Sequence, residues 1–192
     1  SDYQCLDMEA LEAWKKIKSN YISDDITRIL ILYWFDKRRT KKETKNKAEK
    51  TLDYLRFYNG PDASFLFYGT LRELLSLGVN SVTISNGNLS NLKIKDLNLV
   101  YSKLIAVNFS NSTLTNSKFS DCDLEASQFV DTKFKNVDLV NVNIQRAKFI
   151  NSKLNAMNFT KSNIIGTDFK NSELKSAIFK GVDCSNVSFK GA

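Results

Sequence analysis

The feature that most constrains this chain is a rhythm of large apolar side chains at every fifth residue of its second half. From Ile84 to Phe189 each of these positions holds Leu, Ile or Phe, with Cys184 as the one exception. A period of five fits neither the turn of an α-helix nor the two-sided alternation of an ordinary strand. The segment therefore needs a repeating geometry of its own, in which one large side chain in every five residues points inward.

A second restricted position lies two residues before each large apolar one. Small or β-branched residues dominate it, and consecutive members are Val107, Ser112, Ser117, Cys122, Ser127, Thr132, Val137 and Val142. The residue between the two is usually polar, as at Asn108, Asp123 and Asp168. Two inward and three outward residues in every five indicate a coil that turns a corner every five residues.

Two stretches, NFSNSTLTNSKFSDCDL and FKNSELKSAIFKGVDCSNVSF, resemble the A-(D/N)-L-x-x repeat of the pentapeptide-repeat family, with Ser or Val often replacing its Ala. The resemblance implies an all-β solenoid over residues 81–192, a right-handed quadrilateral β-helix with four repeats, or 20 residues, per coil. At that spacing Leu104 stacks on Ile84. Cys122 and Cys184 then lie three coils apart, too far for a disulfide, so we expect both to be inert core thiols.

Residues 1–80 predict a small α-helical region that precedes and caps the solenoid. Helical apolar stripes are formed by Leu11, Trp14 and Ile17, by Ile26, Ile29, Leu30, Tyr33 and Trp34 after the candidate N-caps Ser23 and Asp24, and by Leu52 and Leu55. Thr70 and Glu73 form a candidate capping box for a last helix that ends at Gly78. We expect this helix to cover the open edge of the first coil.

The outward positions place six lysines on one side of the solenoid: Lys93, Lys95, Lys133, Lys135, Lys153 and Lys175. Clustered lysines create a positive potential, so this side is a candidate surface for phosphate, anionic lipid or an acidic protein. The alternative is that they solubilise an exposed β-surface and discourage edge association. No aromatic residues interleave them, so a base-stacking nucleic-acid site is not expected. Nucleic acid and anionic membrane are both possible partners, but neither is favoured over a protein.

Three smaller features have competing interpretations. We expect the basic run 37–50 to be a solvated helix face or an exposed linker, because Glu43 and Glu49 are spaced to pair with its lysines. The alternative is that this run contacts nucleic acid or a membrane surface. Val130 and Ile150 are outward apolar residues that a partner protein would cover. A similar group, Val100, Tyr101 and Ile105, marks either a partner contact or, as we prefer, packing against the N-terminal helices of the same chain.

Enzymatic and cofactor-binding patterns are absent from the sequence. The chain has no histidine, no GxGxxG motif, no P-loop and no metal-ligand spacing, so we expect no catalytic activity and no cofactor. Its longest apolar run, Ile29 to Phe35, is far shorter than the roughly 20 residues of a membrane span, and no signal peptide is recognisable. We expect a cytoplasmic protein, or one delivered to a host cell if it is an effector.

The leading hypothesis is a non-enzymatic protein–protein interaction module built on a rigid solenoid. The family resemblance implies two alternatives: a targeting or substrate-binding fragment of a larger bacterial effector, and a topoisomerase-binding DNA mimic. Residues 81–192 hold 14 basic and 9 acidic residues, and this positive balance disfavours DNA mimicry. No helix or proline follows Phe189 to cover the last coil, so a homodimer through that coil and a longer natural chain are both considered.

Overall fold

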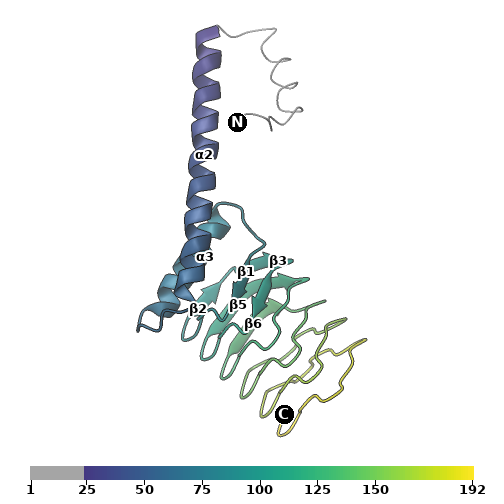
Figure 1. The fold of residues 1–192 in the computed structure, drawn as a ribbon. Helices are drawn as coiled ribbons and strands as arrows, with labels where there is room; N and C mark the ends of the chain where they lie inside the picture. Colours follow the sequence, from purple (N-terminus) through teal and green to yellow (C-terminus); the bar gives the residue numbers. More distant parts are fainter. Residues whose placement is uncertain (1–23) are drawn as a thin grey trace. The chain divides into compact units, whose positions relative to one another are not determined.

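The computed structural model describes residues 24–192, with side chains from residue 29 onward. The chain divides into two compact units, residues 1–44 and 45–192. Two helices, α2 (Asp24–Leu55) and α3 (Ala63–Ser76), precede six short strands. These are β1 (Thr83–Ser85), β2 (Lys93–Lys95), β3 (Asn98–Val100), β4 (Lys103–Ile105), β5 (Thr113–Ser120) and β6 (Lys133–Asp138) (Figure 1).

Helix α2 is continuous where the sequence suggested separate helical segments. No Gly or Pro interrupts residues 24–55, and the basic run forms an exposed part of the helix, not a linker. Glu49 pairs with Lys45 at 3.7 Å, as predicted, whereas Glu43 pairs with Arg39 at 2.8 Å and not with a lysine. The stripe at Leu11, Trp14 and Ile17 and the N-cap Ser23 lie outside the described residues.

The end of α2 and helix α3 form one apolar cluster with the first coil. Ala48, Leu52 and Leu55 of α2 are buried, as are Phe67, Leu71 and Leu74 of α3, and the cluster continues into Ile84, Leu89 and Ile94. A methyl group at Gly87 would lie 2.5 Å from the Phe67 ring, so glycine permits the close approach of α3 to the coil. The Lys95 backbone N–H donates to the Tyr68 hydroxyl at 3.2 Å.

For helix α3, the predicted start is wrong and the predicted end is correct. The helix begins at Ala63, and Thr70 donates its hydroxyl to the Leu66 carbonyl inside the helix, so the predicted capping box at Thr70 does not exist. The apolar residues before Thr70 continue the helix in the N-terminal direction. The predicted stop at Gly78 is confirmed by its φ of 81° and by the hydrogen bond from the Val79 N–H to the Leu74 carbonyl.

All strand pairs are parallel and join residues 20 positions apart. Ile84 pairs with Leu104, Ile94 with Leu114, and Leu99 with Phe119. Leu114 continues its column to Phe134, and isolated bridges such as Lys148 to Asp168 extend the same register toward the C-terminus. These pairs confirm a β-solenoid with 20 residues per coil, and its stacked coils are visible in Figure 1.

A left-handed backbone residue closes each five-residue segment. The residue two positions after each large apolar one has a positive φ, and this position is rich in Asn, Asp and Gly, which tolerate that conformation. The following coil accepts the freed N–H groups: Asn86 donates to the Ile105 carbonyl at 3.0 Å and Asn111 to the Val130 carbonyl at 2.8 Å. The turn residues therefore also connect successive coils.

Buried hydroxyl groups explain why Ser and Thr replace Ala at the small inward position. Ser112 donates to the Leu89 carbonyl at 2.8 Å and accepts from the Leu92 N–H at 3.0 Å. Ser127, three sides further along, makes the equivalent pair of bonds with the Leu104 carbonyl and the Val107 N–H. Among the described residues every buried side-chain nitrogen or oxygen has a partner, so the hydrogen bonds of these hydroxyls offset the cost of removing them from water.

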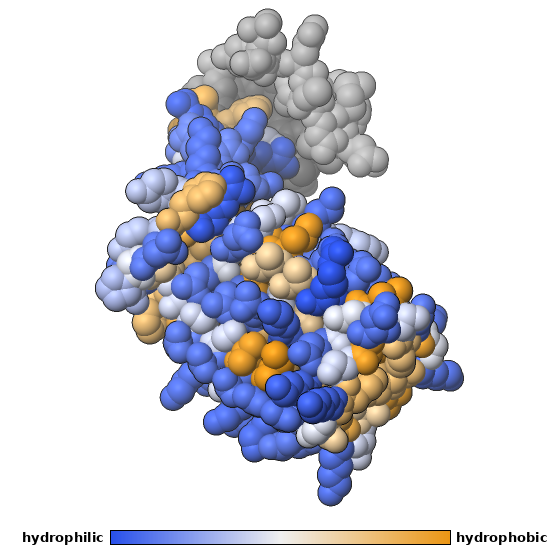
Figure 2. All heavy atoms as spheres, turned by 60° about the horizontal axis from the view of Figure 1, so that its bottom comes forward, coloured by the Kyte–Doolittle hydropathy of each residue, from blue (hydrophilic) through white to orange (hydrophobic). Residues whose placement is uncertain are grey.

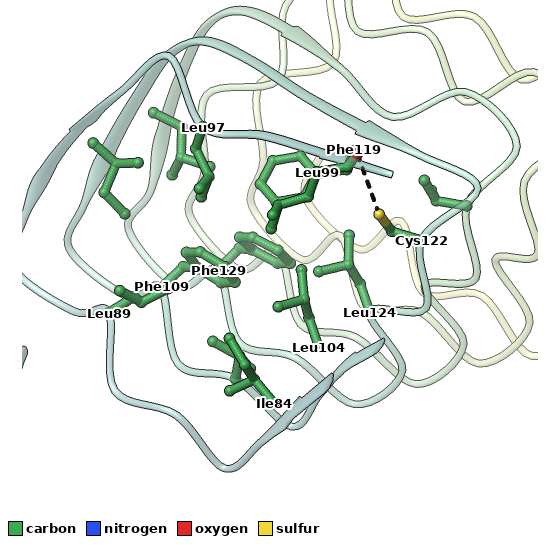
Figure 3. Packing of buried hydrophobic residues seen from close by; sticks show 14 of the residues in the cluster. Ile84, Leu89, Leu97, Leu99, Leu104, Phe109, Phe119, Cys122, Leu124 and Phe129 are labelled. Atoms are coloured by element: carbon green, nitrogen blue, oxygen red, sulfur yellow. Dashed lines mark hydrogen bonds between the residues drawn. The ribbon is translucent and has the colours of Figure 1, made fainter. Parts of the chain in front are cut away.

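Phenylalanine rings stack in columns along the solenoid interior, as the register at 20 predicts (Figure 3). In one column Phe129 stacks on Phe109 at 4.8 Å and Phe149 on Phe129 at 4.6 Å, between ring centroids. Cys122 lies in the same core, with its thiol 3.5 Å from the Leu99 carbonyl, and burial raises the pKa of that thiol. Cys184 is free and exposed, so the prediction that it is a core thiol is wrong: no further coil of the described chain covers it.

Candidate partner-binding surface

The six predicted lysines do lie on one side of the solenoid, in two parallel columns that we call the lysine face. The first column runs through Lys93, Thr113, Lys133, Lys153 and Glu173, as the parallel pairs show. The second runs through Lys95, Thr115, Lys135, Asn155 and Lys175. All six lysine side chains are exposed. The lysine face is Lys93, Lys95, Lys133, Lys135, Lys153 and Lys175.

The backbone fixes the spacing of these cations. Each pair of lysines in one strand flanks an inward side chain, Ile94 between Lys93 and Lys95 and Phe134 between Lys133 and Lys135, so both members of a pair point outward. Neighbouring coils are separated by the usual strand spacing of about 4.8 Å. Lys133 and Lys153 therefore lie on adjacent coils, and Thr113 separates Lys133 from Lys93.

One carboxylate of the chain itself already binds to this face. Glu173 accepts from the Lys153 ammonium at 2.9 Å and from the Asn155 amide at 3.0 Å. The hydrogen bond from Lys153, reinforced by the one from Asn155, lowers the pKa of Glu173. Within the described part of the chain, the other five lysines of the face form no ion pair.

A shallow polar hollow of about 370 Å³ borders the lysine face at a corner of the coil. Its lining residues are Asn111, Ser112, Thr113, Asp131, Thr132, Lys133, Asn151 and Lys153. The hydroxyls of Ser112 and Thr132 are committed to backbone carbonyls at 2.8 and 3.0 Å, and Asp131 adds a negative charge. Among the described residues no group of three potential metal ligands occurs. The hollow suits a contact surface better than a reaction site.

Val130 and Ile150 lie on adjacent coils. Each precedes a lysine of the lysine face by three residues, Val130 before Lys133 and Ile150 before Lys153, and the corner that lines the hollow lies between the apolar residue and the lysine. Both apolar residues are half-buried, not fully exposed. Each carbonyl is bound by the preceding coil: the Asn111 N–H donates to Val130 and the Asp131 N–H to Ile150. They form a small apolar margin beside the lysine face.

Other apolar residues are exposed where the sequence had suggested contacts or had given no signal. Tyr101 is 72% exposed, so its predicted packing against the N-terminal helices is wrong. Phe65 and Leu66 of α3 are exposed, as are Ile178 and Phe189 near the C-terminal end. Ile178 occupies an outward position that is usually polar, a signal that the sequence did contain. Figure 2, in which the lower end of Figure 1 comes forward, shows apolar patches on a mostly hydrophilic surface.

Comparisons with known proteins agree on the type of repeat. A family model described as a pentapeptide repeat region matches residues 77–149, and a model of eight pentapeptide repeats matches residues 138–175 and 158–192. No curated protein matches the chain significantly.

Three solved structures illustrate the structural likeness. A pentapeptide repeat protein from the thylakoid lumen of Arabidopsis thaliana is 24% identical, with 50% of this chain and 69% of that one covered and a TM-score of 0.47. Rfr23 from the cyanobacterium Cyanothece 51142 is 24% identical, with coverages of 55% and 63% and a TM-score of 0.35. The plasmid-mediated fluoroquinolone resistance protein QnrB1 is 13% identical, with coverages of 57% and 77% and a TM-score of 0.30.

Proposed function

This chain belongs to the pentapeptide-repeat family, and from that premise we propose that it is a non-enzymatic module that binds an acidic protein. In this proposal its β-helix is right-handed and quadrilateral, and one of its four sides, the lysine face, is the binding surface. The observation that carries the proposal is the register of 20, which gathers six exposed lysines on one side with Glu173 as the acid paired to them.

Rigidity favours binding through such a surface. The lysines project from backbone that is hydrogen-bonded to the coils before and after it, so only their side chains lose freedom when a partner docks. Clustered charge of one sign also accelerates the encounter with a partner of opposite charge. The apolar margin of Val130 and Ile150 would add desolvated contact at the edge of this surface.

The Glu173 contact suggests how a partner's carboxylate would be held. Lys153 and Asn155, the two outward residues on either side of Leu154, both donate hydrogen bonds to that carboxylate. One coil earlier the same two positions hold Lys133 and Lys135, both cationic. We therefore assign these two lysines, with Lys153, as the centre of the proposed contact for Asp or Glu side chains.

The decisive experiment compares two charge reversals of equal size. Affinity capture from cell extract with the intact protein would be repeated with Lys133→Glu, Lys135→Glu and Lys153→Glu combined, and with Lys118→Glu, Lys148→Glu and Lys161→Glu combined. The control lysines are exposed but lie on other sides of the solenoid. We expect a specific partner, identified by mass spectrometry, to be lost only with the first variant. Equal loss with both variants, or retention with both, would refute the role of the lysine face.

The same surface would serve a targeting or substrate-binding segment of a larger bacterial effector, because both roles need a stiff docking side and no catalytic group. Duplex DNA mimicry is not proposed, since it needs negative charge where this chain carries a lysine face.

A further inference from the structure

Helix α2 exposes a continuous apolar segment from Ile29 to Phe35. Six of its seven side chains are classed among the exposed large apolar groups: Ile29, Leu30, Leu32, Tyr33, Trp34 and Phe35. Their exposed fractions range from 38% for Trp34 to 68% for Leu32. An exposed run of this size marks a contact that the described residues do not supply.

A basic collar follows the apolar segment directly. It consists of Lys37, Arg38, Arg39, Lys41 and Lys42, all exposed, while Asp36 and Glu43 are the acids that bracket it. Arg38 lies over the Trp34 ring at 3.6 Å and Lys37 over the Tyr33 ring at 6.0 Å, so cations contact the last aromatic residues of the segment.

Apolar and basic residues are separated along the helix axis, not around it. Seven consecutive residues make about two helical turns, so the apolar side chains surround the helix, and the collar surrounds it too. A helix that packs on another protein helix usually carries its apolar residues as a stripe on one side. A second helix would cover one side of the segment from Ile29 to Phe35 and leave the others in water.

We infer that this part of α2 docks on the surface of an anionic lipid membrane, an interaction separate from the function proposed for the lysine face. The segment enters the boundary between headgroups and acyl chains, and the basic collar binds anionic headgroups. Interfacial helices sink about 5–10 Å, which covers most of a helix about 10 Å across. Trp and Tyr beside cations are typical of this boundary.

The geometry points to association with the surface and not to a span. Seven residues extend the helix by about 10 Å, against roughly 30 Å of hydrocarbon. In the described part of the chain no helix has the length and apolar character that crossing a membrane requires. We therefore expect the helix to lie along the membrane surface.

The test uses Trp34 as the reporter. The chain has two tryptophans, so Trp14→Phe leaves Trp34 alone. This full-length protein would be mixed with vesicles of phosphatidylcholine, with or without phosphatidylserine, and followed by Trp34 emission and co-sedimentation. We expect a blue shift and binding to the vesicles that contain phosphatidylserine, and a decrease in binding at high salt. Each basic residue near an anionic surface contributes about five-fold, so Lys37→Gln, Lys41→Gln and Lys42→Gln together should weaken partitioning roughly 100-fold.

Matched variants separate this surface from the rest of the molecule. Leu30→Ser with Leu32→Ser should abolish the emission shift, whereas Phe65→Ser with Leu66→Ser, an exposed apolar pair on α3, should leave it unchanged. Replacing Lys133, Lys135 and Lys153 by Gln should also leave vesicle binding intact, although it would abolish the partner binding proposed above.

Three results would overturn the inference. Binding without a change in Trp34 emission would place another surface on the membrane. A stable dimer that Leu32→Ser dissociates, with no vesicle binding, would make a second copy the occupant of the segment. A monomer whose Trp34 emission is already blue-shifted without vesicles, and unaffected by them, would show that the chain covers the segment itself.

Discussion

Replacing Phe149 by Ala tests whether the phenylalanine columns form the solenoid core. The ring is fully buried between Phe129, at 4.6 Å and 8°, and Phe169, at 5.3 Å and 16°, and it meets Phe159 edge-on at 6.1 Å. Deleting a buried Phe side chain costs about 3–5 kcal/mol through lost burial and the cavity left behind. Each lost ring pair accounts for about 0.5–1.5 kcal/mol within that range.

The same substitution at Phe189 provides the comparison. Phe189 is 40% exposed and stacks on a single column neighbour, Phe169, at 5.4 Å. With part of its surface already in water, Phe189→Ala should cost only about 1–2 kcal/mol. Both figures are losses in the free energy of unfolding.

Denaturant unfolding followed by far-UV circular dichroism would measure both variants, since residues 81–192 contain no tryptophan to report on the solenoid. Stacked repeats can unfold in steps, so the midpoint and steepness of each transition should be compared as well as the fitted free energy. Equal destabilisation by the two substitutions would refute a core whose strength depends on neighbours on both sides.

Four further predictions concern the first coils and the cysteines. Ser112→Ala removes a hydroxyl bound to the Leu89 carbonyl and the Leu92 N–H, so unfolding experiments should show a loss of about 1 kcal/mol; no loss would mean that water replaces the hydroxyl. Gly87→Ala should cost about 1–3 kcal/mol because its methyl group would meet the Phe67 ring, whereas Gly69→Ala, with open space around it, should be neutral or stabilising. In a Cys5→Ser background, maleimide should label exposed Cys184 rapidly and buried Cys122 only on unfolding, and equal rates would contradict the packing. Because burial raises the pKa of Cys122 above its usual 9.0, its thiol should stabilise the fold fully below pH 9 and progressively less above it, relative to Cys122→Ala.

The register of the solenoid was predictable because every coil repeats the same requirement. A single shifted residue would move the whole Leu, Ile and Phe series from inside to outside, so the rhythm alone selects the inward positions. The step of 20 came from the family resemblance, and the pairs Ile84 to Leu104 and Leu99 to Phe119 confirm it. The placement of the lysine face followed directly.

The wrong predictions concern residues whose burial or helix boundary depends on contacts with other parts of the chain and not on the sequence pattern around them. Cys184 has the inward position of its segment, but burial there requires a further coil. Thr70 and Glu73 have the spacing of a capping box, yet Phe67 before them contacts the first coil and keeps the helix going. Ile29 and Tyr33 belong to a helical apolar stripe in the sequence, yet their side chains are exposed. Helical periodicity identifies a face but does not supply its partner.

The left-handed residue at each corner has a consequence for how such chains change. Because each coil offers the next one the same set of hydrogen-bonding groups, we expect that a block of 20 residues can be duplicated or lost while the coils on either side keep their pairing. Each added block lengthens the rod by about 4.8 Å and adds one row of outward residues to every side. The number of coils therefore sets the length of the lysine face along the solenoid axis.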